Sequence, residues 1–411
     1  MPRPSFIHSN QVILFPPNNK DLLISKASFN LLQICKTMPS VTNSPVNNGE
    51  TSLHYAAEIT DNDIHYQFED RDIMKLLLDY GGDVNVQTKD AESVVHRCCR
   101  SGNHNILSEI LDKIGAGGAQ IVINKQSKNG WSPLLYAADR GHIEVVKLLL
   151  VHNARVDVFD ETGRTALHWA ADSCQPEVCE LLIKHKAFVN SKTKTGLTPM
   201  HLAAERGHVS VIQVLTANQK AIIDAGSLES RTPLHFSAKS GQIDATTSLL
   251  DLGSNPNARD AKGQSPLHLA AESDYPDVVK LFLKMKPDIS TLTATDENGF
   301  TCAHIAAMKG SVSVVRELMT IDKEMVLSAQ TKSTQSTALH LAAAGGHKNA
   351  VRVLVTSGAV PTTETTNGMT PVHLAAKFGH MDVLEVIDNS LWGYCSKKVS
   401  FVLAFNSKAQ F

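Results

Sequence analysis

The stretch Thr198-Pro199-Met200-His201-Leu202-Ala203-Ala204 decides the fold of this chain, because it recurs along the sequence. A second full copy is Thr370-Pro371-Val372-His373-Leu374-Ala375-Ala376. Looser copies begin at Thr51, Ser93, Ser132, Thr165, Thr232, Ser265, Thr301 and Thr337. The ten copies follow one another at intervals of 42, 39, 33, 33, 34, 33, 36, 36 and 33 residues. A period near 33 predicts a stack of repeats in which each unit contacts only its neighbours.

The copy that begins at Ser132 shows how one unit is expected to fold. Asn129-Gly130 favours a turn at the tip of a β-hairpin-like loop. Ser132 then occupies the N-cap of a short helix, with Pro133 at the first helical position. Gly141 suits the left-handed end of that helix. A second, more apolar helix is predicted over residues 143–150, so each unit is a helix-turn-helix.

Stacking must bury the apolar faces, since no single unit can bury its own. We therefore expect Leu149→Ala or Leu202→Ala to cost ~2–5 kcal/mol of stability. The longer intervals between copies predict inserted loops, since a solenoid tolerates insertions there. These loops are expected around residues 61–70, within residues 112–123, and near Pro287 and Asp322.

Composition limits the classes of function. The chain has 411 residues and a net charge of -2, from 39 basic and 41 acidic residues. This charge balance gives no general electrostatic attraction to nucleic acid. No apolar stretch approaches the ~18–20 residues of a membrane helix, and no signal peptide is evident. The seven cysteines form no CxxC pair, which indicates reduced cytosolic thiols, several of them in the core.

Histidine is abundant, yet its spacing indicates structure rather than chemistry. Nine of the 18 histidines occupy the motif and four more follow a helix-ending glycine, so they form a row instead of converging on a metal or a substrate. Cys174 and Cys179 lack two further zinc ligands nearby. Residues 115–118 are rich in glycine but lack the ending of a phosphate loop, and they predict a flexible inserted loop. We therefore expect no catalytic, cofactor-binding or metal site, and no enzyme, since too few residues lie outside the repeats.

A partner is expected to bind the hairpin tips and the inner helix face, which together form a long surface. Large or charged side chains at the tips are the candidate contacts. These residues are Trp131, Arg164, Arg231 and Phe300. Ordinary hairpin packing is the alternative interpretation of the same residues.

The Thr-Pro-X-His-X-Ala motif and its period resemble the ankyrin repeat. The resemblance covers residues 50–388 and implies an all-α solenoid of about ten helix-turn-helix units with β-hairpin-like loops. It leaves residues 1–49 as an irregular N-terminal segment and residues 389–411 as a non-repeat tail.

Stretches outside the consensus resemble a narrower family. Residues 79–89, 153–160 and 301–308, with His65-Tyr66 and residues 69–73, are similar to the ankyrin array of TRPN (no mechanoreceptor potential C) channels. In that family a long cytoplasmic array precedes a six-helix cation channel, which is a homotetramer. The array tethers the channel to microtubules and passes force to the gate. By this resemblance the chain would be a middle portion of such a tether.

Two hypotheses remain open from the sequence. In the first, the chain is part of a channel tether, and the apolar residues 399–411 reflect a truncated gene product. In the second, the chain is a free-standing soluble ankyrin adaptor that binds another protein through its concave face. Downstream channel exons would separate the two.

Overall fold

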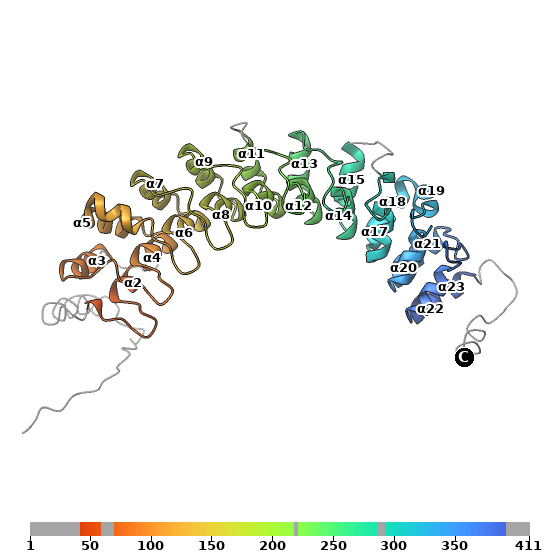
Figure 1. Cartoon of the computed structure of the whole chain (residues 1–411), viewed down its shortest axis with the longest axis horizontal. Coiled ribbons are helices and arrows are strands. Elements are labelled where there is room, and N and C mark those ends of the chain that lie inside the picture. The colour runs from red at the N-terminus through yellow and green to blue at the C-terminus, as the bar shows by residue number, and fades with distance from the viewer. Residues whose placement is uncertain (1–41, 59–69, 218–220, 286–291, 392–411) are drawn as a thin grey trace, which may run out of the picture. The chain divides into compact units, whose positions relative to one another are not determined.

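The computed structural model describes residues 42–58, 70–217, 221–285 and 292–391 (Figure 1). The chain divides into two compact units. One contains the residues up to Ala137 together with His142–Arg155, and the other contains Ala138–Gly141 and the residues from Val156 onward. The predicted all-α repeat solenoid is confirmed: the described residues form helix pairs, and β-structure among them is limited to isolated bridges at Gln87–Ser93 and Phe159–Thr165.

The first unit contains the first three copies of the motif. Its helices are α2 (Ser52–Ala56), α3 (Asp70–Asp79), α4 (Val94–Ser101), α5 (His104–Val122) and α7 (Ile143–Val151), and α6 (Pro133–Arg140) contributes its N-terminal half. Helix α4 packs on α2 and α5, and α5 packs between α3 and α7.

The second unit contains the remaining seven copies of the motif. Its helices are α8 (Ala166–Asp172), α9 (Pro176–Lys184), α10 (Pro199–Arg206), α11 (Val209–Ala217), α12 (Pro233–Lys239), α13 (Ile243–Asp251), α14 (Pro266–Glu272), α15 (Pro276–Met285), α17 (Cys302–Lys309), α18 (Val312–Ile321), α19 (Lys323–Ser328), α20 (Ala338–Ala344), α21 (Lys348–Thr356), α22 (Pro371–Lys377) and α23 (Met381–Leu391). The first helices of successive repeats lie side by side in one row, from α8 to α22 (Figure 1). The second helices, from α9 to α23, form another row.

Alanines and caps explain why each first helix is short and closely packed. In α10, Ala203 and Ala204 are fully buried, so the neighbouring helices approach closely. The helix ends at Gly207, whose φ of 82° lies in the left-handed region that the sequence predicted for this position. The second helices are buried by larger side chains, such as Leu149 in α7, which is fully buried.

Most hairpin turns are closed by a side chain five residues before the helix cap. In the second unit, Asp160 Oδ1 accepts hydrogen bonds from the backbone N–H groups of Thr162 (2.8 Å) and Arg164 (3.0 Å). The backbone then links one hairpin to the next, because Lys194 N–H donates to the Thr162 carbonyl at 2.9 Å. Equivalent bonds join most successive repeats at their hairpins, in addition to the helix core.

Two predicted loops are wrong, because the inserted residues are helical. Residues 112–123 continue α5 to Val122, with a break at Gly115 (φ 67°, ψ 172°). Ala119 and Val122 are buried, so this added helical segment has its own apolar face. Past Asp322 the chain forms α19, which Asp322 caps by accepting from Met325 N–H at 2.9 Å.

Other expectations fall outside the described residues. They are the inserted loop at residues 61–69, the one near Pro287, the resemblance at His65-Tyr66, the N-terminal segment to residue 41 and the tail from residue 392. Among the described residues, no helix combines the length and the apolar character that a membrane span requires.

Candidate functional site

The motif histidines act as joints between repeats, as their spacing predicted. In nine copies the Nδ1 atom of the histidine accepts from the backbone N–H of the capping Thr or Ser, at 3.0–3.2 Å. An N–H group can only donate, so Nδ1 is unprotonated and the ring proton lies on Nε2. In eight of these copies Nε2 lies 2.9–3.3 Å from a backbone carbonyl of the next repeat, to which it donates.

Burial keeps these rings neutral. His201 is fully buried, and this burial lowers its pKa to about 4. Burial also lowers the pKa values of His96 and His168 to about 4. The histidines that follow a helix-ending glycine have a similar structural role: His208 Nε2 donates to the Asp172 carbonyl at 3.1 Å. Among the described residues, no three His, Cys, Asp or Glu side chains are grouped so that they could hold a metal ion.

One copy lacks the histidine, and its capping serine shows the consequence. Leu135 stands where the other copies have histidine, and the buried hydroxyl of Ser132 has no hydrogen-bond partner. The side chain of Ser132 therefore does not cap the helix, in contrast to the prediction. Pro133 does begin α6 as predicted. The hydroxyl and the imidazole thus act as a pair.

This difference predicts that equivalent truncations have unequal effects. Thr198→Ala removes a hydroxyl that lies 2.8 Å from His201 Nδ1, and we expect it to cost about 1 kcal/mol. Ser132→Ala removes an unsatisfied buried hydroxyl, so the unfolding free energy should change by less than ~0.5 kcal/mol or rise. Urea unfolding followed by circular dichroism measures both. Equal losses would show that the hydroxyls act without the imidazole.

Four of the described thiols fill the core, as expected for reduced structural cysteines. Cys98 and Cys99 replace the usual alanine pair in α4 and are fully buried. Cys179 and Cys302 are also buried, and burial raises the pKa of each to about 12, so they stay protonated and inert. Cys174 is the exposed thiol of the described residues.

The structure places the predicted contact residue Trp131 in the first unit, against its own helix. Its ring centroid lies 4.6 Å from that of Tyr136, and its carbonyl accepts from His96 Nε2 at 3.2 Å. The second predicted contact, Arg164, lies 4.6 Å above the ring of Trp169 and pairs with Asp172 at 3.1 Å. Both residues are partly buried and take part in hairpin packing.

The other two predicted contacts, Arg231 and Phe300, are also partly buried. Arg231 Nε donates to Asp260 Oδ2 at 3.1 Å, and its side chain is only 15% exposed. Phe300 lies 6.3 Å from the ring of His304, and its carbonyl accepts from His268 Nε2. Each of the four predicted residues therefore contacts its own or an adjoining repeat, and their role in binding a partner stays a proposal.

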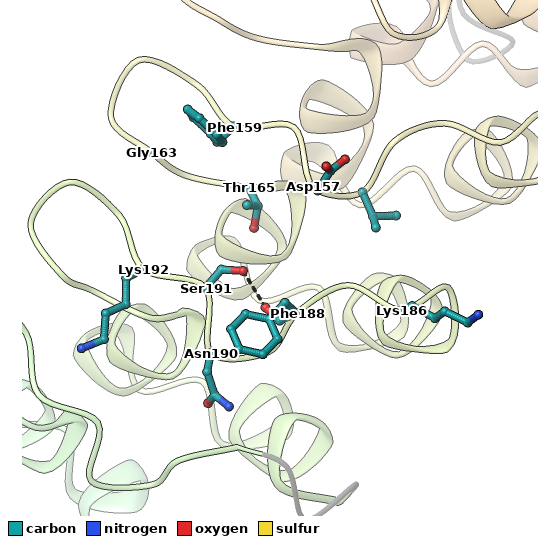
Figure 2. Close-up of a pocket in the computed structure, with 10 residues that line it drawn as sticks. Asp157, Phe159, Gly163, Thr165, Lys186, Phe188, Asn190, Ser191 and Lys192 are labelled. Atoms are coloured by element: carbon teal, nitrogen blue, oxygen red, sulfur yellow. Dashed lines mark hydrogen bonds between the residues drawn. The ribbon is translucent and has the colours of Figure 1, made fainter.

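A groove of about 390 Å³ lies on the second unit, between two successive hairpins (Figure 2). Phe159 and Phe188 flank it, and they are 57% and 68% exposed. The rest of the lining is mostly polar. It consists of Val156, Asp157, Gly163, Thr165, Lys186, Asn190, Ser191 and Lys192.

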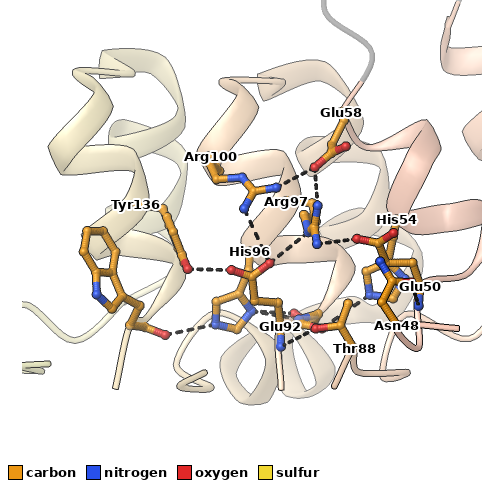
Figure 3. A network of polar contacts seen from close by, with 12 residues as sticks. Asn48, Glu50, His54, Glu58, Thr88, Glu92, His96, Arg97, Arg100 and Tyr136 are labelled. Carbon is orange, nitrogen blue, oxygen red and sulfur yellow. Dashed lines mark hydrogen bonds and ion pairs between the residues drawn. The ribbon is translucent and has the colours of Figure 1, made fainter. Parts of the chain in front are cut away.

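A polar network links residues of α2, α4 and α6 and the segments beside them in the first unit (Figure 3). Arg97 is at its centre and is 14% exposed: Nη2 lies 2.6 Å from Glu50 Oε1, Nε lies 2.9 Å from Glu92 Oε2, and Nη1 pairs with Glu58. Arg100 also pairs with Glu58, at 2.6 Å. Tyr136 donates its hydroxyl proton to Glu92 at 2.5 Å, so one cluster of charges ties three repeats together.

We expect Arg97→Met to destabilise the first unit by about 2 kcal/mol, because three partly buried carboxylates lose their shared cation. The cost stays below the ~3–5 kcal/mol of a fully buried pair, since Glu58 is 37% exposed and screened by solvent. Arg206→Met is the matched control: this arginine pairs with Asp172 at 3.0 Å but is 61% exposed, so its loss should cost less than ~1 kcal/mol. Urea unfolding measures both variants, and equal costs would mean that the network adds nothing beyond a surface pair.

Sequence reasoning missed both the groove and the network. Comparing the copies position by position would have revealed Phe188, because Asn255 occupies the same place two repeats later. The network was visible as glutamates directly before the first two caps, Glu50 and Glu92, with Arg97 on the helix between them. The side chains that close the hairpin turns, such as Asp160, recur five residues before a helix cap and could also have been predicted from the sequence.

Comparison with known proteins gives one family over most of the chain. The family described as ankyrin repeats (3 copies) matches residues 64–160, 114–193, 189–260, 252–330 and 304–390.

Three individual relatives match parts of the chain. Human transient receptor potential cation channel subfamily A member 1 is 29% identical over 221 residues, which are 51% of this chain and 19% of the relative. The ankyrin repeat and KH domain-containing protein mask of Drosophila melanogaster is 34% identical over 120 residues, 28% of this chain and 3% of the relative. The probable 26S proteasome regulatory subunit p28 of Saccharomyces cerevisiae is 31% identical over 125 residues, 30% of this chain and 49% of the relative. The chain thus spans less than half the length of each of these relatives.

Proposed function

The chain belongs to the ankyrin-repeat family, and on that premise we propose that it is a non-enzymatic protein-interaction scaffold from the cytoplasmic tether of a mechanosensitive, TRPN-type cation channel. In this role the repeats attach to cytoskeletal components, foremost microtubules, and transmit force toward the channel gate. The full-length channel is a homotetramer, and the array lies on the cytosolic side of the plasma membrane.

The similarity to a transient receptor potential channel carries this proposal, because it covers 51% of the chain. The fold supports a mechanical role within each unit. Successive repeats share a helix core, a histidine bond such as His201 Nε2 to the Arg231 carbonyl (2.9 Å), and a hairpin bond such as Leu228 N–H to the Thr195 carbonyl (3.1 Å). These hydrogen bonds connect neighbouring repeats directly, so they can transmit tension from one repeat to the next.

Sequencing the spliced transcript past the codons for Lys397 to Phe411 tests the channel assignment. We expect the message to continue into further ankyrin repeats and then into six apolar segments long enough to span a membrane. An in-frame stop in a spliced message, with no such segments downstream, would contradict a channel tether.

A free-standing adaptor is the second candidate function. The similarity to a probable proteasome regulatory subunit favours it. That relative is named as a proteasome subunit and not as a channel, and the match covers 49% of its length. In this case the array binds a soluble protein, and we propose that the predicted contacts Trp131 in the first unit and Arg164, Arg231 and Phe300 in the second take part in that binding. The transcript described above separates the two candidates.

A further inference from the structure

Phe159 and Phe188 are both exposed and both line the groove. The fold does not require an apolar side chain at the position of Phe188. Phe188 follows the end of α9, and its counterparts in the next two repeats are Ile222 and Asn255. The register is fixed by equivalent bonds: Ile222 N–H donates to Asn190 Oδ1 at 2.9 Å, and Asn255 N–H donates to Asp224 Oδ2 at 3.0 Å. Because an asparagine serves equally well in this place, the packing of the repeat does not explain the phenylalanine.

The surroundings of the groove are locally basic. Lys186 and Lys192 line it and are exposed, against one lining carboxylate, Asp157. The ammonium group of Lys192 donates to a neutral acceptor, the Gly226 carbonyl, at 2.8 Å. The exposed Lys194 adds a further positive charge at the adjoining hairpin tip. This contrasts with the chain as a whole, whose net charge is -2.

We propose that this groove binds a short, extended, acidic peptide segment that carries one aromatic or large aliphatic side chain. The anchor side chain inserts between Phe159 and Phe188, where it buries apolar area on both rings (Figure 2). The flanking carboxylates face Lys186 and Lys192, which supply orientation and a salt-dependent attraction. The proposal rests on the scaffold function and does not depend on the channel assignment.

The charge pattern favours a peptide over a nucleic acid. Single-stranded nucleic acids also stack on aromatic rings, but their binding needs phosphate contacts along several successive nucleotides. Here three exposed lysines lie within residues 186–194, whereas Arg164 and Arg231 at the neighbouring tips pair with Asp172 and Asp260. The preceding tip also carries the exposed Glu161, and the following one carries the exposed Glu229. A short segment with a few carboxylates matches this extent, whereas a longer polyanion meets glutamates on both sides.

Fluorescence anisotropy of a labelled synthetic peptide, a central Phe flanked by glutamates, tests the proposal on the full chain. We expect saturable binding that weakens at least about tenfold in Phe188→Ser, since a central apolar anchor is lost. Lys186→Ser with Lys192→Ser should weaken binding about threefold to tenfold at low salt and much less at about 300 mM salt. Phe378→Ser is the matched control, because this phenylalanine is 54% exposed on another repeat and should leave binding unchanged. Circular dichroism checks that each variant keeps its helices.

The outcomes separate the groove from the scaffold function. A peptide with alanine in place of the central Phe should bind at least about tenfold more weakly, which would support the anchor. Equal binding by wild type and Phe188→Ser would overturn the groove assignment and leave the scaffold function standing. Stronger binding of oligothymidylate than of the peptide would overturn the choice of ligand. The absence of binding for the whole peptide panel would overturn the proposal, whereas a failure to bind cytoskeletal polymers would count against the channel tether and leave the groove assignment unaffected.

Discussion

Lowering the pH from 7 to 5 is expected to destabilise the protein by several kcal/mol. Burial lowers the pKa values of His96, His168 and His201 to about 4, whereas the same residues titrate near ~6.5 in the unfolded chain. Between these two values the unfolded chain binds more protons, so the free energy of unfolding falls as the pH falls. The stabilisation is fully present above about pH 6.5, and each of the three histidines loses about 2 kcal/mol by pH 5.

The structural reason is that protonation breaks the joint. Nδ1 of His201 already accepts from the Thr198 N–H at 3.0 Å, so a proton on Nδ1 removes this bond and leaves a buried charge. Urea unfolding at a series of pH values between about 7 and 5 measures the slope, and His201→Gln should make it shallower. Phe378→Ser is the control, because this exposed residue has no ionisable group and its loss should leave the slope unchanged. A stability that stays level across this pH range would contradict the structural role of the histidines.

The second large effect is expected at the interface between stacked repeats. Leu202 lies in α10, which packs between α8 and α12, and it is 1% exposed. Leu202→Ala should therefore cost ~2–5 kcal/mol through lost burial and the cavity left behind. The same range applies to Leu149→Ala in the first unit, where Leu149 is fully buried.

Leu228→Ala is the matched control, because this leucine is 75% exposed at a hairpin tip and should cost less than ~0.5 kcal/mol. The measurement is urea unfolding of the full chain. If Leu202→Ala and Leu228→Ala cost the same, the stack of repeats would not be the source of stability in this region.

The sequence predicted the fold because its signals are local and repeated. The capping Thr198, the histidine three residues later and Gly207 at the helix end each have a local physical reason, and the structure confirms them. The loop predicted within residues 112–123 was wrong. Its glycines suggested a loop, whereas burial of Ala119 and Val122 in the tertiary structure makes the segment helical.

The candidate site was less predictable, because it depends on exposure and on contacts between repeats. Large residues at hairpin tips were a reasonable guess, yet Arg231 is held by Asp260 of the next repeat, a pairing that sequence spacing does not show. Phe188 was not predicted as a site residue, because the sequence of a single repeat does not distinguish a buried phenylalanine from an exposed one. The Arg97 network likewise needs three repeats to assemble.

Co-sedimentation of the purified full chain with stabilised microtubules tests the proposed tether most directly. The account predicts that the chain pellets with microtubules in a saturable, salt-sensitive manner and stays in the supernatant without them. If the folded chain remains in the supernatant at every microtubule concentration, the chain is not a cytoskeletal tether, and the adaptor function takes its place.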